Sequence, residues 1–185
     1  MGATGGPAGG GEVVGTGRVE DKDMSDPVWY QYLQGQDDDP LIIPVGYDGS
    51  ITLPDRGWQG LMPRAQEAFT TLSAAALKAE WPIRMTEGFR PRRRQAYLYA
   101  LGRVMRNPNT PKGVAGLGDM VTDALPGKSN HQHRRAFDIC LTGRPDAFNK
   151  EGLTVVGNLG VSQGLEWGGN WTGRIVDRPH FQVPA

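Results

Sequence analysis

The sequence lacks several features that would each point to a class of protein. It has a single cysteine, Cys140, which excludes an internal disulfide and indicates synthesis in a reducing compartment. No run approaches about 18 consecutive apolar residues, so we expect no membrane span. No apolar run follows a basic start, so we expect no secretory signal. The 185 residues are enough for one domain with a real core.

An excess of charge of either sign is also missing, because the formal net charge is zero. The charges are nevertheless uneven. Residues 1–39 hold eight acids and two bases, whereas residues 82–135 hold eleven bases and three acids. Ordinary surface charge and a basic cleft for a substrate with carboxylates explain this pattern equally well. Basic and aromatic residues do not alternate as in nucleic-acid-binding segments, so we expect no nucleic-acid partner.

Large apolar side chains are nearly absent from the start of the chain. Residues 1–17 contain eight glycines, and such a segment cannot bury enough surface to offset its ordering entropy. We therefore expect a disordered, Gly-rich and acidic tail over residues 1–25 and one folded domain over residues 26–185. The three successive carboxylates at 37–39 lack the spacing of a calcium loop, which favours a solvated turn.

Hydrophobic periodicity predicts both helices and strands. Helices are expected at about 63–80, 92–106 and 153–163. Strands are expected at 83–86, 135–141 and within 177–183, and a short strand or an extended arm at 41–45. In the third strand, Phe137, Ile139 and Leu141 alternate with smaller or polar residues, so they face the core. Asp138 then points to the opposite face, with space beside it for a ligand.

Two compact clusters combine histidine with aspartate. His131 and Asp138 lie seven residues apart, and they converge if the histidine closes a loop and the aspartate lies in the next strand. His180 supplies a third ligand, and two histidines, one aspartate and an open position make a catalytic zinc site. Asp177, three residues before His180, is a candidate general base. Glu166 competes for that role on chemical grounds.

Three motifs stand in order along the chain. The matched positions are Gly88-Phe89-Arg90 with Gln95, then Ser129, His131, Ala136 and Asp138, then Glu166 to Trp171 with Asp177 to Phe181. These motifs resemble the zinc D,D-carboxypeptidase and endopeptidase family of the VanY and LAS type, over roughly residues 60–183. Within it, the chain is most similar to bacteriophage endolysins that cleave the L-alanyl-D-glutamate bond of peptidoglycan.

The resemblance implies a fold and a site. The fold is α+β, with a small antiparallel sheet that carries the zinc site and packs against N-terminal helices, as in LAS and hedgehog-like zinc peptidases. The implied cofactor is Zn²⁺, bound by His131, Asp138 and His180. Asp177 matches the catalytic carboxylate. Arg90 matches the arginine that stabilises the developing oxyanion or binds the substrate carbonyl.

Other matched residues are expected to contact substrate or to support the site. Ser129 is expected to orient the site by hydrogen bonding, and Glu166 to brace the Trp-Gly-Gly turn. Gln95 and Trp167 are further candidates from the same motifs. Arg92, Arg93 and Arg94 are expected to be solvated helix residues, with contact to stem-peptide carboxylates as the less favoured alternative.

One position departs from the family pattern. Arg134 stands where the family has glycine, which usually permits a tight turn or a close approach of the backbone. Arginine could tolerate the same backbone, or it could narrow the cleft and add a contact to a carboxylate. His133, just before it, is an alternative to His131 as a ligand.

The implied function is that of a zinc metallopeptidase that hydrolyses peptidoglycan stem peptides. An L-alanyl-D-glutamate endopeptidase acting as a phage endolysin is the first hypothesis, and a D-alanyl-D-alanine carboxypeptidase is the second. A non-catalytic or virion-associated wall-binding protein is the alternative from another class. We expect a monomer, made in the host cytoplasm, that acts on the bacterial cell wall after release.

Overall fold

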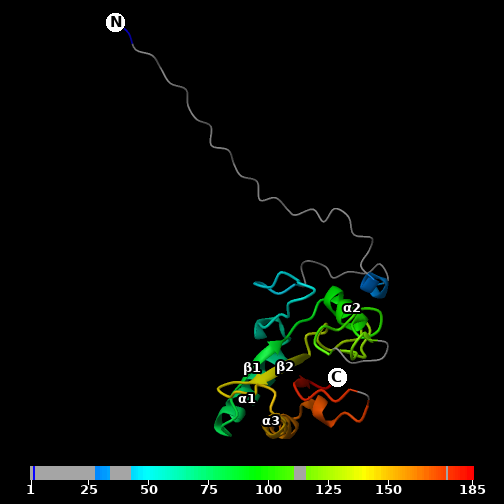
Figure 1. Cartoon of the computed structure of the whole chain (residues 1–185). Helices are drawn as coiled ribbons and strands as arrows, with labels where there is room; N and C mark the ends of the chain where they lie inside the picture. The colour runs from blue at the N-terminus through cyan, green and yellow to red at the C-terminus, as the bar shows by residue number, and fades with distance from the viewer. Residues whose placement is uncertain (1, 3–27, 34–42, 111–115, 174) are drawn as a thin grey trace.

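A four-stranded antiparallel sheet lies at the centre of the fold (Figure 1). The computed structural model describes residues 2, 28–33, 43–110, 116–173 and 175–185. The strand order is β1-β2-β4-β3. The strands are β1 (Ile83–Glu87), β2 (Ala136–Leu141), β3 (Glu166–Trp167) and β4 (His180–Gln182). The expected α+β architecture is confirmed.

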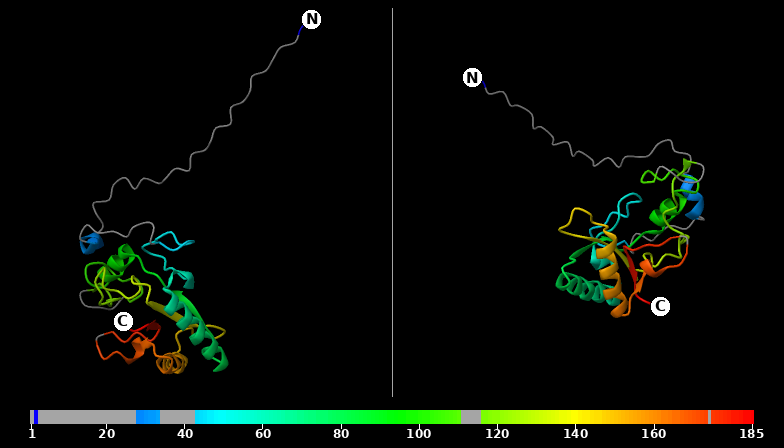
Figure 2. Two further views of the ribbon diagram at one scale, coloured as in Figure 1. Left: turned by 180° about the vertical axis from the view of Figure 1, so that it is seen from behind. Right: turned by 60° about the horizontal axis from the view of Figure 1, so that its bottom comes forward.

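Two helices cover one face of this sheet. Helices α1 (Pro63–Lys78) and α3 (Lys150–Ser162) pack against each other and against strands of the sheet (Figure 2). Helix α2 (Arg92–Ala100) lies apart from them and packs against the 3₁₀ helix η1 (Val28–Leu33). The 3₁₀ helices η3 (Trp58–Gly60) and η5 (Gly168–Asn170) complete the regular structure of the described residues.

The core lies between the sheet and helices α1 and α3. Phe137 of β2 is fully buried and stacks on Phe181 of β4, with 5.8 Å between ring centroids. Trp167 of β3 stacks on the other side of Phe181 at 6.5 Å. Burying a large apolar side chain contributes about 1.5–3 kcal/mol, so this row holds the three strands together. The opposite face of the same strands is free to carry polar groups.

Helix α3 forms in spite of its glycines, which are poor helix formers. A Cβ at Gly157 would overlap the ring of Trp167, and one at Gly160 would overlap the ring of Phe181. The glycines therefore let α3 approach the aromatic row closely, and tertiary packing outweighs their low propensity. The helix starts at Asn149, whose side chain accepts a hydrogen bond from Gly152 N–H at 3.1 Å.

Two elements differ from the expectations. Helix α2 ends at Ala100 rather than near residue 106, because Leu101 is extended and Gly102 takes a φ of +74°. A Cβ at Gly102 would overlap the carbonyl of Asp119, so a close approach to a distant loop ends the helix there. Of the two alternatives at 41–45, the short strand is wrong in its described part, since residues 43–45 form no strand.

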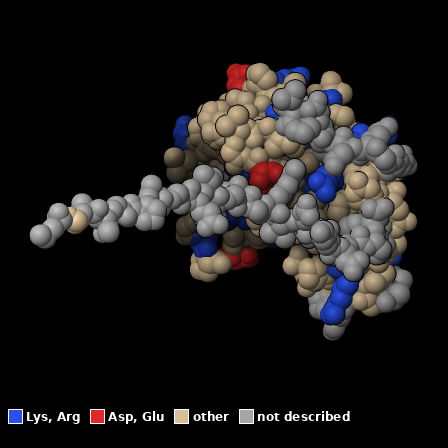
Figure 3. All heavy atoms as spheres, turned by 90° about the horizontal axis from the view of Figure 1, so that it is seen from above, with Lys and Arg blue, Asp and Glu red and all other residues tan. Residues whose placement is uncertain are grey.

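Several expectations concern residues that are not described. Apart from residue 2, the tail over 1–25 lies outside the described residues, as does the acidic turn at 37–39. No described helix is long and apolar enough to cross a membrane. Figure 3 shows Lys and Arg side chains interspersed with Asp and Glu over the described part of one face.

Candidate metal centre and catalytic cleft

A cleft of about 620 Å³ opens beside the polar face of the sheet. Its walls come from β1, β2, β4, α2, the loop at 121–131 and residues 171, 173, 175 and 177. Arg90, His131, Asp138, Asp177 and His180 all line it. The structure thus brings the five principal residues expected from the sequence into one cavity.

Three of these residues present ligand atoms to one point. Asp138 of β2 lies directly opposite His180 of β4 in the antiparallel register, so their side chains share a face. Asp138 Oδ1 is 3.0 Å from His180 Nδ1 and 3.3 Å from His131 Nε2. The two imidazole nitrogens are 3.1 Å apart. Ligand atoms bound at about 2.0–2.2 Å to one tetrahedral ion lie roughly 3.3–3.6 Å apart. The three atoms are therefore only slightly closer together than they would be around a bound metal ion.

When the two imidazoles are neutral, their outer hydrogen bonds leave the inward nitrogens without protons. His131 Nδ1 is 2.8 Å from the carbonyl oxygen of Gly88, which can only accept, so Nδ1 carries the proton. His180 Nε2 is 3.0 Å from Gln182 Oε1, also an acceptor. Two lone pairs and a carboxylate oxygen therefore face the same point, an arrangement that is unfavourable without a cation. The donor set fits Zn²⁺.

Without a metal, Asp138 and the two histidines stabilise each other's charged forms. Burial alone would raise the pKa of Asp138, but the charges and hydrogen bonds of His131 and His180 hold it well below the usual range. Burial alone would lower the pKa of His180, yet the hydrogen bond and charge of Asp138 raise it. The site as built favours positive charge beside Asp138.

The turn before β2 places His131. Ser129 Oγ accepts a hydrogen bond from His131 N–H at 3.3 Å, and Arg134 N–H donates to the His131 carbonyl at 3.1 Å. Arg134 has a φ of +59°, so arginine adopts the left-handed conformation that glycine would take. Its guanidinium donates to the Gly60 carbonyl at 2.9 Å and lies over the Phe89 ring.

The structure distinguishes between the two hypotheses for Arg134 and between His131 and His133 as the candidate ligand. The side chain of Arg134 does not line the cleft, so the hypothesis that it narrows the cleft is wrong. The other hypothesis fits, because Arg134 adopts the backbone conformation that glycine would have at this position. His133 is exposed and is not part of the three-residue cluster. His131 is the histidine of this turn that faces Asp138.

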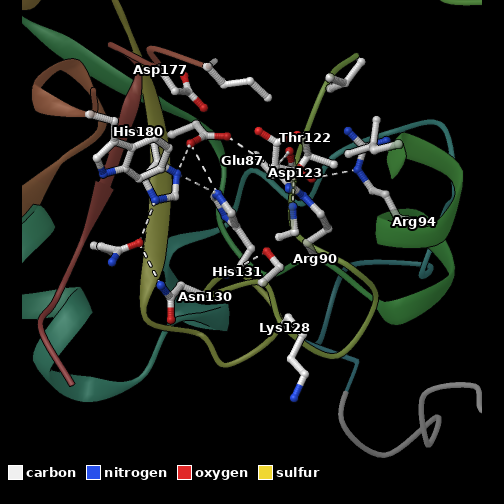
Figure 4. A pocket seen from close by; sticks show the side chains of 18 of the residues that line it. Glu87, Arg90, Arg94, Thr122, Asp123, Lys128, Asn130, His131, Asp177 and His180 are labelled. Atoms are coloured by element: carbon white, nitrogen blue, oxygen red, sulfur yellow. Dashed lines mark hydrogen bonds and ion pairs between the residues drawn. The ribbon is translucent and has the colours of Figure 1, made fainter. Parts of the chain in front are cut away.

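Asp177 is held at the cleft by the aromatic and glycine turn before it. Its N–H donates to the Gly168 carbonyl at 3.0 Å, and a Cβ at Gly168 would overlap the carbonyl of Asp177. Trp167 Nε1 donates to the Arg178 carbonyl at 2.8 Å. Figure 4 shows Asp177 on the side of His180 opposite Asn130. Burial raises the pKa of Asp177, and the charge of Asp138 raises it further.

Arg90 belongs to a buried ionic network. It donates to Glu87 Oε2 at 2.7 Å, to Gln95 Oε1 at 3.0 Å and to Asp138 Oδ2 at 3.4 Å. Arg94 donates to the other Glu87 oxygen at 2.7 Å. Burial alone would raise the pKa of Glu87, but Arg90 and Arg94 lower it to about 2. The expectation that Arg94 is solvated is wrong, because this ion pair and its place against β1 bury it.

The remaining candidates lie around the cluster rather than in the cleft. Gln95 is buried behind Arg90, and its Nε2 donates to the Ala124 carbonyl at 2.6 Å. Trp167 is part of the core and does not line the cleft. Glu166 is exposed on β3, and its carboxylate accepts a hydrogen bond from Gln182 Nε2.

Sequence reasoning missed three polar residues at the site. Glu87 was visible only as an acid three residues before Arg90, and Gln182 only as a polar residue two after His180. Asn130 donates to Gln182 Oε1 at 2.7 Å. Spacing of two on a strand places Gln182 on the His180 face, and that signal could have found it.

A small antiparallel sheet with two histidines and an aspartate in a cleft, beside a second carboxylate and a buried arginine, is the constellation of a metal-dependent hydrolase. Comparison with known proteins gives the particular family. A family model described as D-alanyl-D-alanine carboxypeptidase matches residues 123–183. Peptidoglycan L-alanyl-D-glutamate endopeptidase CwlK of Bacillus subtilis (strain 168) is 30% identical over 135 residues, which are 66% of this chain and 73% of CwlK. The chain belongs to this M15 peptidase family, the VanY and LAS type, and is a hydrolase.

Solved structures of similar proteins include two peptidases. The L-Ala D-Glu endopeptidase ChiX of Serratia marcescens is 18% identical with a TM-score of 0.49, covering 73% of this chain and 89% of ChiX. The LD-carboxypeptidase LdcB is 20% identical with a TM-score of 0.48, covering 66% of this chain and 58% of LdcB. Metal dependence is typical of the family, and His131, Asp138 and His180 form a cluster among the described residues that could hold a metal ion.

Proposed function

We propose that the chain is a zinc metallopeptidase that hydrolyses stem peptides of bacterial peptidoglycan. The observation that carries this proposal is the convergence of His131 Nε2, His180 Nδ1 and Asp138 Oδ1, each 3.0–3.3 Å from the others. Zn²⁺ held there would supply Lewis acidity toward a peptide carbonyl and would lower the pKa of water. The relative CwlK, named as a peptidoglycan endopeptidase, supports the substrate class.

Asp177 is the residue that moves protons in this proposal. Its carboxylate lines the cleft next to His180, where it accepts a proton from the attacking water and delivers it to the leaving amine. Glu166, the competing base, is exposed and lies outside the cleft lining. The position of Asp177 therefore favours it over Glu166.

Arg90 has two roles in the proposal. It holds Asp138 Oδ2 at 3.4 Å, which turns Oδ1 toward the histidines. It also places a fixed positive charge in the cleft wall, where it stabilises negative charge on the substrate carbonyl oxygen. Gln95 and Glu87 orient the guanidinium for both tasks.

The bond between L-alanine and D-glutamate is our first choice for the scissile bond, supported by CwlK. Cleavage of terminal D-alanine is the second, supported by the description of the matching family model. The motif resemblance to phage enzymes further supports an endolysin, a monomer made in the host cytoplasm that reaches the wall after release. The non-catalytic alternative is disfavoured, because the family is one of peptidases.

The test combines metal content, a wall digest and one variant. The purified protein should carry about one zinc per chain, and mass spectrometry of digested peptidoglycan should show new L-alanine carboxyl termini. Asp177→Ala should keep zinc and lose at least about 100-fold in rate, whereas Asp48→Ala, exposed and outside the cleft, should not change the rate. Zinc well below one equivalent, or an active Asp177→Ala, would overturn the assignment.

A further inference from the structure

A row of hydrogen bonds crosses the polar face of the sheet from Glu166 through Gln182 to His180. We propose that Glu166 and Gln182 are positioning residues that fix the proton of His180 on Nε2, so that Nδ1 is kept as a metal ligand. The inference rests on the metal site proposed above. It gives two residues outside the ligand set a defined chemical task.

The sheet register brings the three residues together. Glu166 of β3 lies directly opposite Gln182 of β4, and Gln182 is two residues after His180, so all three share one face. Gln182 Nε2 donates to Glu166 Oε2. Gln182 Oε1 is 3.0 Å from His180 Nε2 and also accepts from Asn130 Nδ2 at 2.7 Å.

The acceptor-only chemistry of a carboxylate sets the direction of the row. Because the Glu166 carboxylate only accepts, the amide NH₂ of Gln182 must face it, and Oε1 must face His180. An amide oxygen also only accepts, so His180 Nε2 must be the nitrogen that carries the proton. Nδ1 then has a free lone pair 3.0 Å from Asp138 Oδ1.

Without this row, the other tautomer of His180 would be preferred. A proton on Nδ1 could be donated to Asp138 Oδ1, a stronger acceptor than an amide. That proton would occupy the direction in which a metal must bind. His131 meets the same need through the backbone carbonyl of Gly88, whereas His180 depends on side chains, which substitutions can change.

The row also accounts for the place of Glu166 in its motif. Trp167 points into the core and Glu166 to the opposite face, so the two residues of β3 serve the two faces of the sheet. Glu166 does not line the cleft. Its task is exerted through Gln182, and it touches neither substrate nor metal.

The decisive variant is Glu166→Lys, which replaces an acceptor by a donor. Gln182 Oε1 should turn to the lysine and its NH₂ to His180, moving the proton to Nδ1. Imidazole ¹⁵N NMR of the metal-free protein, recorded at a pH high enough to keep His180 neutral, reads this change, and the chain has only three histidines to assign. Zinc affinity, measured by competition with a chromophoric chelator, should fall about 10–100-fold. Glu67→Lys, the same charge change at an exposed site on α1, should leave both readouts unchanged.

Two further variants test the hydrogen bonds from Glu166 through Gln182 to His180 if Glu166→Lys folds poorly. Gln182→Leu removes the acceptor and should weaken zinc binding about 10–100-fold. The exchanged double variant Glu166→Gln with Gln182→Glu keeps an acceptor for His180 and a donor–acceptor bond between the strands. It should restore the Nε2 proton and wild-type affinity. Unchanged tautomer and affinity in Glu166→Lys, or no recovery in the double variant, would overturn the proposal, whereas a wild type that binds no zinc would instead refute the metal site.

Discussion

The two flanks of the metal cluster are built from opposite kinds of interaction. Around His180, the neutral amides of Gln182 and Asn130 make hydrogen bonds that end on an exposed carboxylate. Around Arg90, the full charges of Glu87 and Arg94 are buried against each other. In Figure 4 the two flanks lie on either side of His131. The neutral flank determines where protons sit, and the ionic flank determines where a carboxylate and a cation are held.

This difference predicts how each flank responds when a partner is removed. A buried ion pair costs most when one member is lost, because an uncompensated charge stays buried. A partly exposed amide is replaced by water at small cost. Substitutions in the ionic flank should therefore reduce stability, and those in the neutral flank should mainly change metal binding.

The largest effect is expected for Glu87→Gln. It removes the carboxylate that pairs with Arg94 and the nearer of the two that pair with Arg90, so the free energy of unfolding should fall by about 3–5 kcal/mol in urea titrations. Asp123→Asn, which loosens the more exposed pair with Arg103 at 3.2 Å, should cost at most about 1 kcal/mol.

A pH series gives the same prediction a second readout. The pKa of Glu87 is lowered from its usual 4.5 to about 2, so the wild type should lose stability as pH falls from 4.5 toward 2. Glu87→Gln should lack this loss. If wild type and Glu87→Gln had the same free energy of unfolding at pH 7, the ion pairs of Glu87 would not contribute to the stability of the fold.

Asn130→Ala probes the neutral flank with a smaller change. It removes the hydrogen bond of 2.7 Å to Gln182 Oε1 and should cost about 1 kcal/mol of stability. Zinc affinity should fall less than in Gln182→Leu, because Glu166 still orients the amide. A stability loss as large as that of Glu87→Gln would contradict the prediction that substitutions in the neutral flank cost less stability than those in the ionic flank.

The sequence predicted the centre of the site better than its flanks. His131, Asp138 and His180 could be found because alternation in β2 and the motif spacing are local properties of the chain. Their role as zinc ligands stays a prediction, but the structure places them within reach of one ion. The flanks depend on strand register, which sets Glu166 opposite Gln182 and shifts by a bulge before Glu87. Register is a non-local property, and one sequence does not show it.

Tertiary contacts also explain the errors in secondary structure. Leu98, Leu101 and Met105 have helical spacing, yet the chain leaves the helix after Ala100 and pairs Leu101 with Met105. Arg94 was expected to be solvated because it stands in a run of three arginines. The helix turns only one of the three fully inward, onto Glu87. Composition cannot tell which one without the position of the sheet.

A buried carboxylate near the ionic flank sharpens the comparison with Glu87. Asp55 is buried, its Oδ1 accepts from Gly57 N–H at 2.9 Å, and its Oδ2 has no hydrogen-bond partner among the described residues. Burial raises the pKa of Asp55 above its usual 3.8, the opposite of the shift at Glu87. Burial outweighs the backbone hydrogen bonds and the charge of Arg134, which both act to lower the pKa of Asp55.

Asp55→Asn should therefore be as stable as the wild type at pH 7, or more so by up to about 1 kcal/mol. A raised pKa in the folded protein means that ionisation destabilises it, so the wild type should recover relative to the variant as pH falls toward 3.8. Urea midpoints at several pH values measure this difference. A variant that is less stable at pH 7 and unresponsive to pH would show that the carboxylate is compensated in the fold.

The smallest effect is expected at Arg134, in the turn that joins the two flanks. The left-handed conformation at φ +59° costs a non-glycine residue about 1–2 kcal/mol, and the bond to the Gly60 carbonyl returns about 1 kcal/mol. Arg134→Gly should therefore change stability by less than about 1 kcal/mol. Arg134→Ala keeps the strain and loses the contacts, so it should be about 1 kcal/mol less stable than the glycine variant.

Both Arg134 variants should bind zinc as the wild type does, because the Arg134 side chain points away from the cluster toward Gly60 and Phe89. Thermal unfolding and chelator competition measure the two properties separately. If Ala were tolerated better than Gly, the backbone would not be strained at this turn. If either variant weakened zinc binding tenfold, the turn would have to be counted with the neutral flank, since its geometry would then hold His131 as firmly as Gln182 holds His180.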